Sequence, residues 1–185
     1  AASPFIYSEM MIRSPWAHTG VILKGIDPDR TGRVTEVRDS LTEGYMGSLT
    51  SPDDREKVYQ SVSTLLGPNP NRDSIVSDDG AELPSILIGG ELAEQLDVSP
   101  GDKVQLVNPL GGGAGPMGMP SPSVMSFRVG GVYVSGMYEY DTKWTYIFNK
   151  TAQDFLKLGD TVNGVEVRIS DPDDVHRIAE VINTK

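Results

Sequence analysis

A stretch rich in glycine and proline interrupts the middle of this 185-residue chain and restricts how the chain can fold. It runs from Leu110 to Met125 and lies between two segments of strand-like composition, 104–107 and 127–134. Proline has no amide proton to donate and glycine has no side chain to pack, so neither suits the interior of a sheet. We therefore expect this stretch to leave the sheet as a long hairpin arm or loop between two strands.

The apolar residues of this stretch predict an exposed surface that binds a protein partner. They are Leu110, Pro116, Met117, Met119, Val124 and Met125. Methionine is flexible and polarisable, which suits adaptable contacts between proteins, and exposed apolar patches commonly mark such contacts. A disordered loop with no partner is the alternative interpretation.

Strands and short helices alternate along the rest of the chain without a regular repeat. Strands are expected at 5–12, 21–26, 86–88, 104–107, 127–134, 145–148 and 165–169. Helices are expected at 52–66, 91–96, 150–158 and 174–182, with a further candidate at 31–41. Because long strand–helix–strand units are missing from this pattern, the predicted class is α+β with mixed strands and short helices.

The segment Ser99-Pro100-Gly101-Asp102 predicts a tight turn directly before the strand at 104–107. Glycine adopts positive φ without steric cost, so we expect Gly101 to have this conformation. The Asp102 carboxylate is expected to bond to the backbone of the turn. We interpret this motif as structural.

The charge of the chain excludes several classes of partner. Its formal net charge is −10 and its pI is about 4.6. Nucleic acids and anionic membrane surfaces are bound by basic patches, so neither is an expected partner. The chain has no cysteine and no apolar run that approaches the ~20 residues of a membrane span. Its first residues have no charged n-region, so we do not expect them to form a signal peptide.

No pattern of residues indicates catalysis, a metal or a cofactor. The two histidines, His18 and His176, have no metal-ligand spacing, and neither a P-loop nor a G-x-S-x-G motif is present. The acidic pairs at 53–54 and 173–174 begin predicted helices, where they interact favourably with the helix dipole. We therefore expect no enzyme activity, no cofactor and no metal site.

Four motifs carry a resemblance to a known family. They are Ile-Gly-x-Glu-Leu-Ala-x-x-Leu at Ile88–Leu96, Gly-Asp-x-Val at Gly101–Val104, Gly-Met-Tyr-Glu-Tyr-Asp at Gly136–Asp141, and the strand-like Gly164–Ile169. Together they resemble the periplasmic domain of the LolC/LolE lipoprotein-releasing ABC transporter permeases, within the MacB-like periplasmic core group. The best-matching part is 83–171, and the first eighty residues match loosely.

The resemblance implies a fold of two lobes. A discontinuous Porter-type lobe would comprise 1–50 and 140–185, and an inserted Sabre-type lobe would comprise 51–139. The hook-like loop, at about 110–125, would belong to the inserted lobe. The terminal segments are expected to meet in space, because both ends of this domain return to the membrane in a permease.

The resemblance also implies which residues bind a partner. LolC-type members have a hook with a Pro-Met-Gly-x-x-Pro pattern that recruits the lipoprotein carrier LolA, whereas LolE-type members lack it. The hook residues of this chain would be Pro116, Met117, Gly118, Met119 and Pro120, one residue shorter than that pattern. The chain thus resembles a LolC-type or hybrid member.

The implied function is that of a non-catalytic periplasmic domain of a bacterial inner-membrane permease. It would release lipoproteins from the inner membrane and pass them to a LolA-type periplasmic carrier. Its other partners would be a second permease subunit and a cytoplasmic ATPase subunit. The alternatives are a MacB-like mechanotransmission domain of an export or cell-division permease and, from another class, a small-ligand or glycan-binding enzyme domain.

Overall fold

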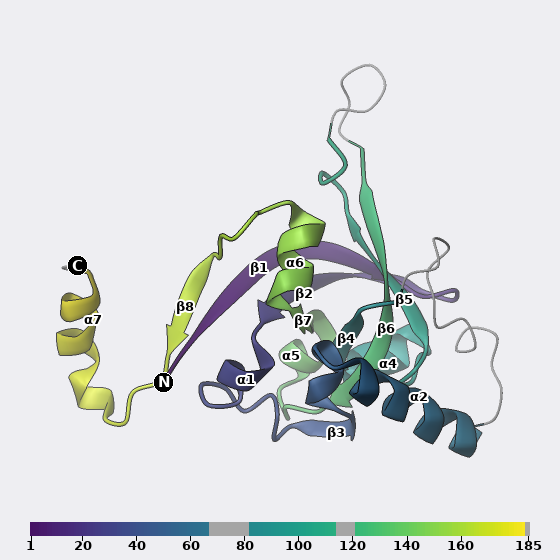
Figure 1. The fold of residues 1–185 in the computed structure, drawn as a ribbon, viewed down its shortest axis with the longest axis horizontal. Coiled ribbons are helices and arrows are strands. Elements are labelled where there is room, and N and C mark those ends of the chain that lie inside the picture. Colours follow the sequence, from purple (N-terminus) through teal and green to yellow (C-terminus); the bar gives the residue numbers. More distant parts are fainter. Residues whose placement is uncertain (67–81, 114–120, 184–185) are drawn as a thin grey trace.

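The computed structural model describes residues 1–66, 82–113 and 121–183, and its mixture of strands and short helices confirms the α+β class (Figure 1). The strands in these ranges are β1 (Ala2–Arg13), β2 (His18–Ile26), β3 (Leu41–Gly44), β4 (Ser85–Gly89), β5 (Lys103–Asn108), β6 (Ser123–Tyr133), β7 (Trp144–Phe148) and β8 (Gly164–Val167). The α-helices are α1 (Pro28–Thr31), α2 (Pro52–Leu66), α4 (Gly90–Leu96), α5 (Tyr138–Lys143), α6 (Asn149–Leu156) and α7 (Val175–Asn183). Short 3₁₀ turns are η1 (Met46–Leu49) and η3 (Pro172–Asp174).

Six strands form a sheet that closes on itself. Their hydrogen-bonded order is β2-β7-β4-β6-β5-β1, and β1 also pairs with β2. The β2–β7 and β4–β6 pairs are parallel, and the other pairs of this ring are antiparallel. We call this ring the barrel. β3 adds to β6 and β8 adds to β1 outside the ring.

One apolar cluster contains side chains from all six barrel strands. It includes Ile6, Leu23, Ile86, Leu106, Phe127 and Ile147, all of them fully buried. Helices α4 and α6 add further apolar side chains to it. The cluster therefore joins residues from both predicted lobes, and the division of the chain into two lobes stays a prediction.

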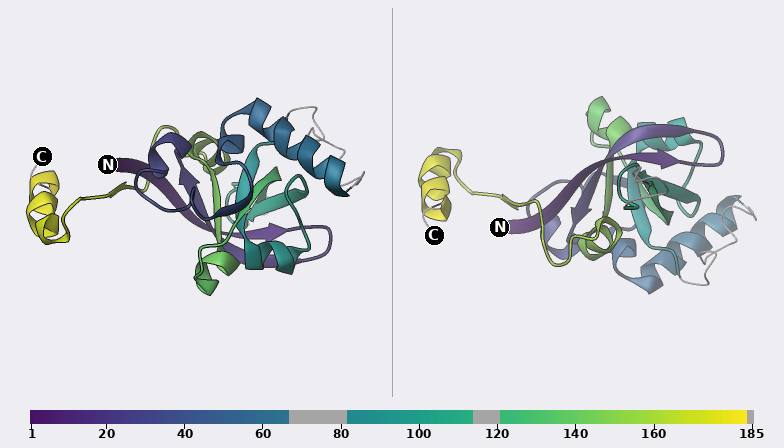
Figure 2. Two further views of the ribbon diagram at one scale, coloured as in Figure 1. Left: turned by 90° about the horizontal axis from the view of Figure 1, so that it is seen from below. Right: turned by 90° about the horizontal axis from the view of Figure 1, so that it is seen from above.

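The terminal segments meet along a two-stranded ribbon. The first residues of β1, Ala2–Phe5, pair antiparallel with β8. The pairing continues to the N-terminal residue, since the Ala1 ammonium donates to the Arg168 carbonyl (2.9 Å) and the Arg168 amide donates to the Ala1 carbonyl (2.8 Å). Beyond the ribbon, α7 stands apart from the barrel in every view (Figures 1 and 2). None of the described helices is long and apolar enough to cross a membrane.

The predicted helix at 31–41 is wrong. The chain forms the short helix α1 earlier, where the Asp27 carboxylate caps the start by accepting a hydrogen bond from the Asp29 amide (3.1 Å). Gly32 ends this helix, and 33–40 form turns that lead into β3. The β-branched side chains of this segment disfavour a longer helix. Strand β3 and helix α5 were not predicted.

The predicted conformation of Gly101 is confirmed. Its φ is +90°, its amide donates to the Val129 carbonyl (2.7 Å), and its carbonyl accepts from the Arg128 guanidinium (2.7 Å). The Asp102 carboxylate accepts from the Ser99 amide (2.9 Å), as expected for a bonded turn. This turn fixes the start of β5 against β6.

Candidate functional site

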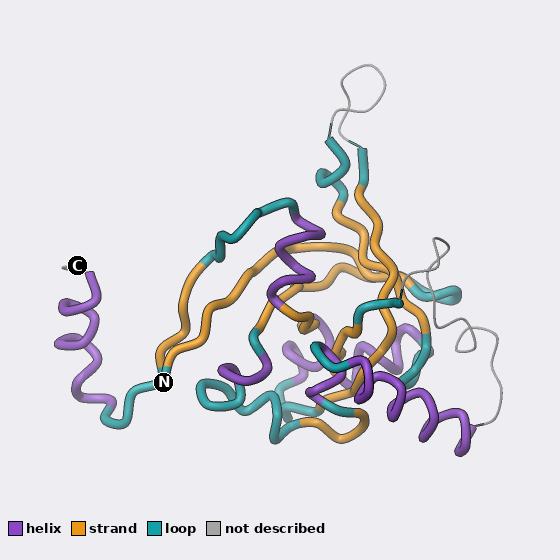
Figure 3. The backbone as a smooth tube through the Cα atoms, in the orientation of Figure 1, coloured by secondary structure: helices purple, strands orange, loops and turns teal. Residues whose placement is uncertain are grey.

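Strands β5 and β6 extend beyond the barrel as a two-stranded arm (Figures 1 and 3). Their register runs from the Lys103–Arg128 pair to the Asn108–Ser123 pair. Val124 and Met125 therefore belong to β6, and the expected loop of 110–125 is too long at its C-terminal end. The reason is that these apolar residues follow the last proline of the stretch, so each pairs with a residue of β5.

The described end of the arm is held together by backbone hydrogen bonds. The Gly112 amide donates to the Ser121 carbonyl (2.8 Å), and the Ser121 amide donates to the Gly113 carbonyl (3.0 Å). A Cβ atom on Gly112 would lie 2.6 Å from the Ser121 carbonyl oxygen, so only glycine fits this close approach. Gly113 and Ser121 are thus paired across the two sides of the arm. All five predicted hook residues, 116–120, lie outside the described residues.

Side chains fix the root of the arm to the barrel and to α2. The Arg128 side chain is buried, and its guanidinium lies 5.3 Å from the centre of the Tyr59 ring of α2. On the outer face, the Arg13 guanidinium donates to the Gln105 side chain (2.8 Å), which donates to the Ser126 hydroxyl (3.1 Å). This chain of contacts crosses β1, β5 and β6 and holds the arm in place.

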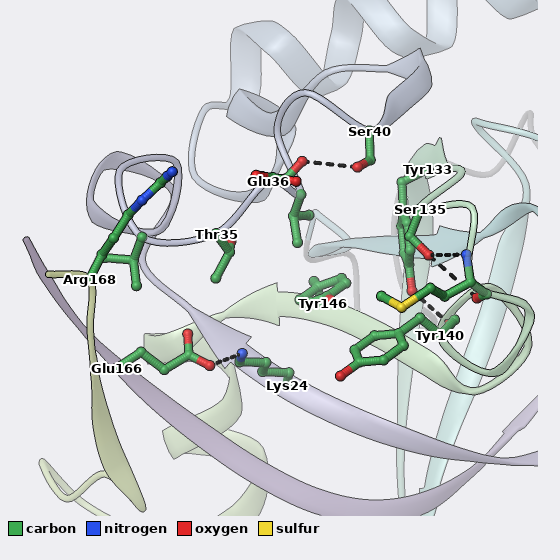
Figure 4. Close-up of a pocket in the computed structure, with 13 residues that line it drawn as sticks. Lys24, Thr35, Glu36, Ser40, Tyr133, Ser135, Tyr140, Tyr146, Glu166 and Arg168 are labelled. Carbon is green, nitrogen blue, oxygen red and sulfur yellow. Dashed lines mark hydrogen bonds and ion pairs between the residues drawn. The ribbon is translucent and has the colours of Figure 1, made fainter. Parts of the chain in front are cut away.

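A pocket of about 490 Å³ lies between the 34–40 segment and the outer face of the sheet (Figure 4). Its floor contains the aromatic rings of Tyr133 and Tyr146 and the ion pair between Lys24 and Glu166. The Lys24 ammonium also lies 5.4 Å and 5.7 Å from the centres of the Phe5 and Trp144 rings. Sequence reasoning missed this site, because its residues come from segments far apart in the chain.

The polar groups on the floor of the pocket bond to each other or to the backbone. The Tyr133 hydroxyl lies within hydrogen-bond distance of the Trp144 carbonyl (2.9 Å) and the Tyr140 carbonyl (3.0 Å). Burial raises the pKa of the Tyr133 and Tyr146 hydroxyls above their ordinary value, so both keep their protons further into the alkaline range than an exposed tyrosine does. The pocket therefore offers a rigid, partly aromatic surface.

The Gly136–Asp141 motif forms a turn and the first part of α5 beside this pocket. Gly136 has a φ of +80°, and the buried Asp141 carboxylate accepts from the Ser135 amide (2.8 Å) and hydroxyl (2.7 Å). The turn leaves Met137 and Tyr138 exposed, at 55% and 69%. The motif was visible in the sequence, but the hydrogen bonds that hold its turn come from a buried carboxylate, which the sequence does not show.

The described residues contain no group of three or more histidine, aspartate and glutamate side chains that could hold a metal ion. His18 begins β2 and His176 lies on α7, and both are exposed. Within the described residues, the arm and the pocket are therefore the candidate functional sites.

Comparison with known proteins finds similarity both in sequence and in structure. No family model matches the chain. Over 172 residues, 93% of the chain, it is 24% identical to the lipoprotein-releasing system transmembrane protein LolC of Neisseria meningitidis serogroup B (strain ATCC BAA-335 / MC58). The chain spans 34% of the length of that relative. This match confirms the resemblance to LolC that the motifs predicted.

In structure, the chain is similar to the extracellular domain of the noncanonic ABC-type transporter YknZ from Gram-positive bacteria. The TM-score is 0.55 at 15% sequence identity, over 100% of this chain and 74% of that domain. The two chains therefore share a fold.

Proposed function

We propose that this chain is a non-catalytic periplasmic domain of an inner-membrane ABC transporter permease. In this proposal the permease releases lipoproteins from the inner membrane, and the domain passes them to a LolA-type periplasmic carrier. The similarity to LolC along nearly the whole chain supports this assignment. The fold shared with the extracellular domain of an ABC-type transporter supports it independently.

The observation that carries the proposal is the arm. Its two strands leave the barrel together, and the residues between them in sequence include two methionines between prolines. Prolines lower the conformational freedom that a segment loses on binding. The surfaces of the two methionines would then provide the apolar contact with the carrier.

The assembly around this domain follows from the same proposal. The chain matches about a third of the LolC relative, and in this proposal the membrane-spanning part would lie in the remainder of the permease. A second permease subunit and a cytoplasmic ATPase subunit would complete the complex. The lipoprotein is the transported substrate and the carrier is the acceptor.

We predict that changing both Met117 and Met119 to aspartate abolishes binding of a purified LolA-type carrier. Burial of a methionine side chain contributes about 1.5–3 kcal/mol, so losing two such contacts corresponds to a loss of at least roughly a hundredfold in affinity. The melting temperature should stay unchanged, because we expect neither side chain to belong to the core. Calorimetric titration and thermal melting on the same protein samples measure both quantities.

Met137→Asp is the matched control, because Met137 is an exposed methionine that directly precedes α5 and lies outside the predicted hook in sequence. It should leave carrier binding intact. A double variant that binds normally would contradict the hook and favour a MacB-like mechanotransmission domain. A double variant that fails to fold would mean that these methionines are part of the core.

A further inference from the structure

The pocket beneath the 34–40 segment has no role in the proposed transport function, and its volume of about 490 Å³ suits a small ligand. Four charged side chains line it: Lys24 and Arg168 are cations, and Glu36 and Glu166 are anions. Their formal charges sum to zero, whereas the whole chain carries −10. The net charge of the pocket therefore favours neither a cationic nor an anionic ligand.

Two of these four charges neutralise each other on the floor of the pocket. Lys24 is buried, and its ammonium forms an ion pair with the Glu166 carboxylate. Breaking a buried ion pair leaves a charge without compensation in the interior, which strongly destabilises a protein. We therefore expect a ligand to leave this pair intact. The charges that remain for the ligand are those of Arg168 and Glu36.

Arg168 and Glu36 lie on the rim of the pocket (Figure 4). Arg168 continues the backbone pairing of β8 with β1, so its side chain projects from the same face as Glu166, two residues earlier. Both rim residues are exposed. Within the described part of the chain, neither the Arg168 guanidinium nor the Glu36 carboxylate forms an ion pair. The rim thus presents one cation and one anion that are not already paired.

An apolar wall completes the pocket. It is formed by Tyr140 and Met137, which are 38% and 55% exposed. The Tyr140 ring stacks on the Trp144 ring, with ring centres 5.1 Å apart and planes inclined by 13°, so its position is fixed. Val37, which also lines the pocket, packs against the buried cluster beneath it. Because these walls are already ordered, little conformational freedom is lost when a ligand binds.

We propose that this pocket binds a small zwitterion with an apolar side chain, either a free α-amino acid or a short peptide. The ligand carboxylate pairs with the Arg168 guanidinium, whose planar donors match a carboxylate in bidentate geometry. The ligand ammonium pairs with the Glu36 carboxylate, and the apolar side chain lies against Tyr140 and Met137. A ligand with a single charge would leave one of the two rim charges without a counter-charge. This inference does not depend on the proposed transport function.

Chemically blocked ligands test the two charge contacts separately. L-phenylalanine and L-alanyl-L-phenylalanine are titrated into the isotope-labelled chain and followed by NMR, each as the free compound, the N-acetyl form and the C-terminal amide. Because ion pairs at exposed positions contribute little, we expect a Kd on the order of 1 mM for the better free compound. Loss of either ligand charge should weaken binding roughly twofold to fivefold. The amides of 34–40 and 135–140 should shift.

Two substitutions assign each contact to its residue. Arg168→Gln should abolish the preference for the free carboxylate over the amide and should retain the preference for the free ammonium. Glu36→Gln should give the reverse pattern. Arg33→Gln is the matched control, because Arg33 is an exposed cation close to Glu36 in sequence that does not line the pocket. This control should retain both preferences.

The relative affinity of the two free compounds identifies the source of the ligand. Tighter binding of phenylalanine indicates an amino acid, and tighter binding of the dipeptide indicates a peptide. Equal affinity of the free and blocked forms would overturn the proposal, as would variants that keep both preferences. The absence of any shift in these amides at about 20 mM of either compound, well above the expected Kd, would also overturn it.

Discussion

At the scale of single residues, Tyr133 and Tyr146 form a buried aromatic pair beneath the pocket. Their ring centres lie 5.3 Å apart in an edge-to-face arrangement, and both side chains are almost fully buried. Removal from water disfavours the ionised form of each hydroxyl and is the main cause of the raised pKa values. The folded chain therefore holds these two protons more tightly than the unfolded chain does.

The free energy of unfolding should consequently depend on pH in the alkaline range. The contribution of the pair is fully present below about pH 10, the ordinary tyrosine pKa. It decreases as the pH rises above this value, because the unfolded chain loses the protons while the folded chain keeps them. Urea unfolding midpoints between pH 7 and 11 measure this decrease.

Tyr133→Phe should reduce that alkaline decrease and should lower the stability at neutral pH by about 1–3 kcal/mol, because a buried carbonyl loses its donor. Tyr138→Phe, at an exposed position, should behave like the unmodified chain. A decrease of the same size in both variants would show that other groups cause it.

At the scale of elements, the arm depends on the close approach of Gly112 to Ser121. A side chain on Gly112 would lie 2.5 Å from the Ser121 hydroxyl oxygen and 2.7 Å from the Pro122 carbonyl oxygen. These contacts are too short for any real Cβ atom. Position 112, at the end of the arm, therefore accepts only glycine.

We predict that Gly112→Val separates the end of the arm without unfolding the barrel. The Ser121 amide, which donates to the Gly113 carbonyl, should exchange with solvent at least tenfold faster. The melting temperature should change little, because the apolar core contains no residue of this part of the arm. Gly20→Val is the control, since its Cβ would meet only an ordinary contact at 4.0 Å. Normal Ser121 exchange in Gly112→Val would contradict this account.

Elements with strong local signals could be predicted from the sequence. Proline at the first helical position and acids in the first turn predicted α2, and alternation of apolar residues predicted β8 to within two residues. The arm could be predicted because its glycines and prolines are concentrated in one stretch of the sequence. By contrast, α5 was missed because a carboxylate from its own interior, Asp141, holds the preceding turn, and spacing alone does not show this bond.

At the scale of the whole molecule, the order of the strands in the sheet could not be predicted from the sequence. Strand β2 pairs with β7, and β1 pairs with β8, over separations of more than a hundred residues. Local patterns contain no information on such pairings. The pocket was unpredictable for the same reason, because only the folded sheet brings Lys24, Tyr146 and Glu166 together.

We expect the chain to unfold in a single cooperative transition, because one apolar cluster joins both predicted lobes. In scanning calorimetry the van't Hoff and calorimetric enthalpies should agree. Leu106→Ala should lower the stability of the whole transition by about 2–5 kcal/mol, as expected for a buried leucine. Two separate transitions, of which this substitution moves only one, would instead show that the lobes unfold independently.

Because the backbones of Ala1 and Arg168 are hydrogen-bonded to each other, residues 1–168 are suitable for insertion into another protein. A host protein could receive this portion within one of its surface loops, because entry and exit would be a single hydrogen-bonded pair apart. The host loop would then bear little extra closure entropy, because this cost grows with the number of flexible residues in a loop and a folded insert with paired ends adds few of them. Engineers could use such a graft to display the arm, with its root held by β1, β5 and β6, on an unrelated scaffold.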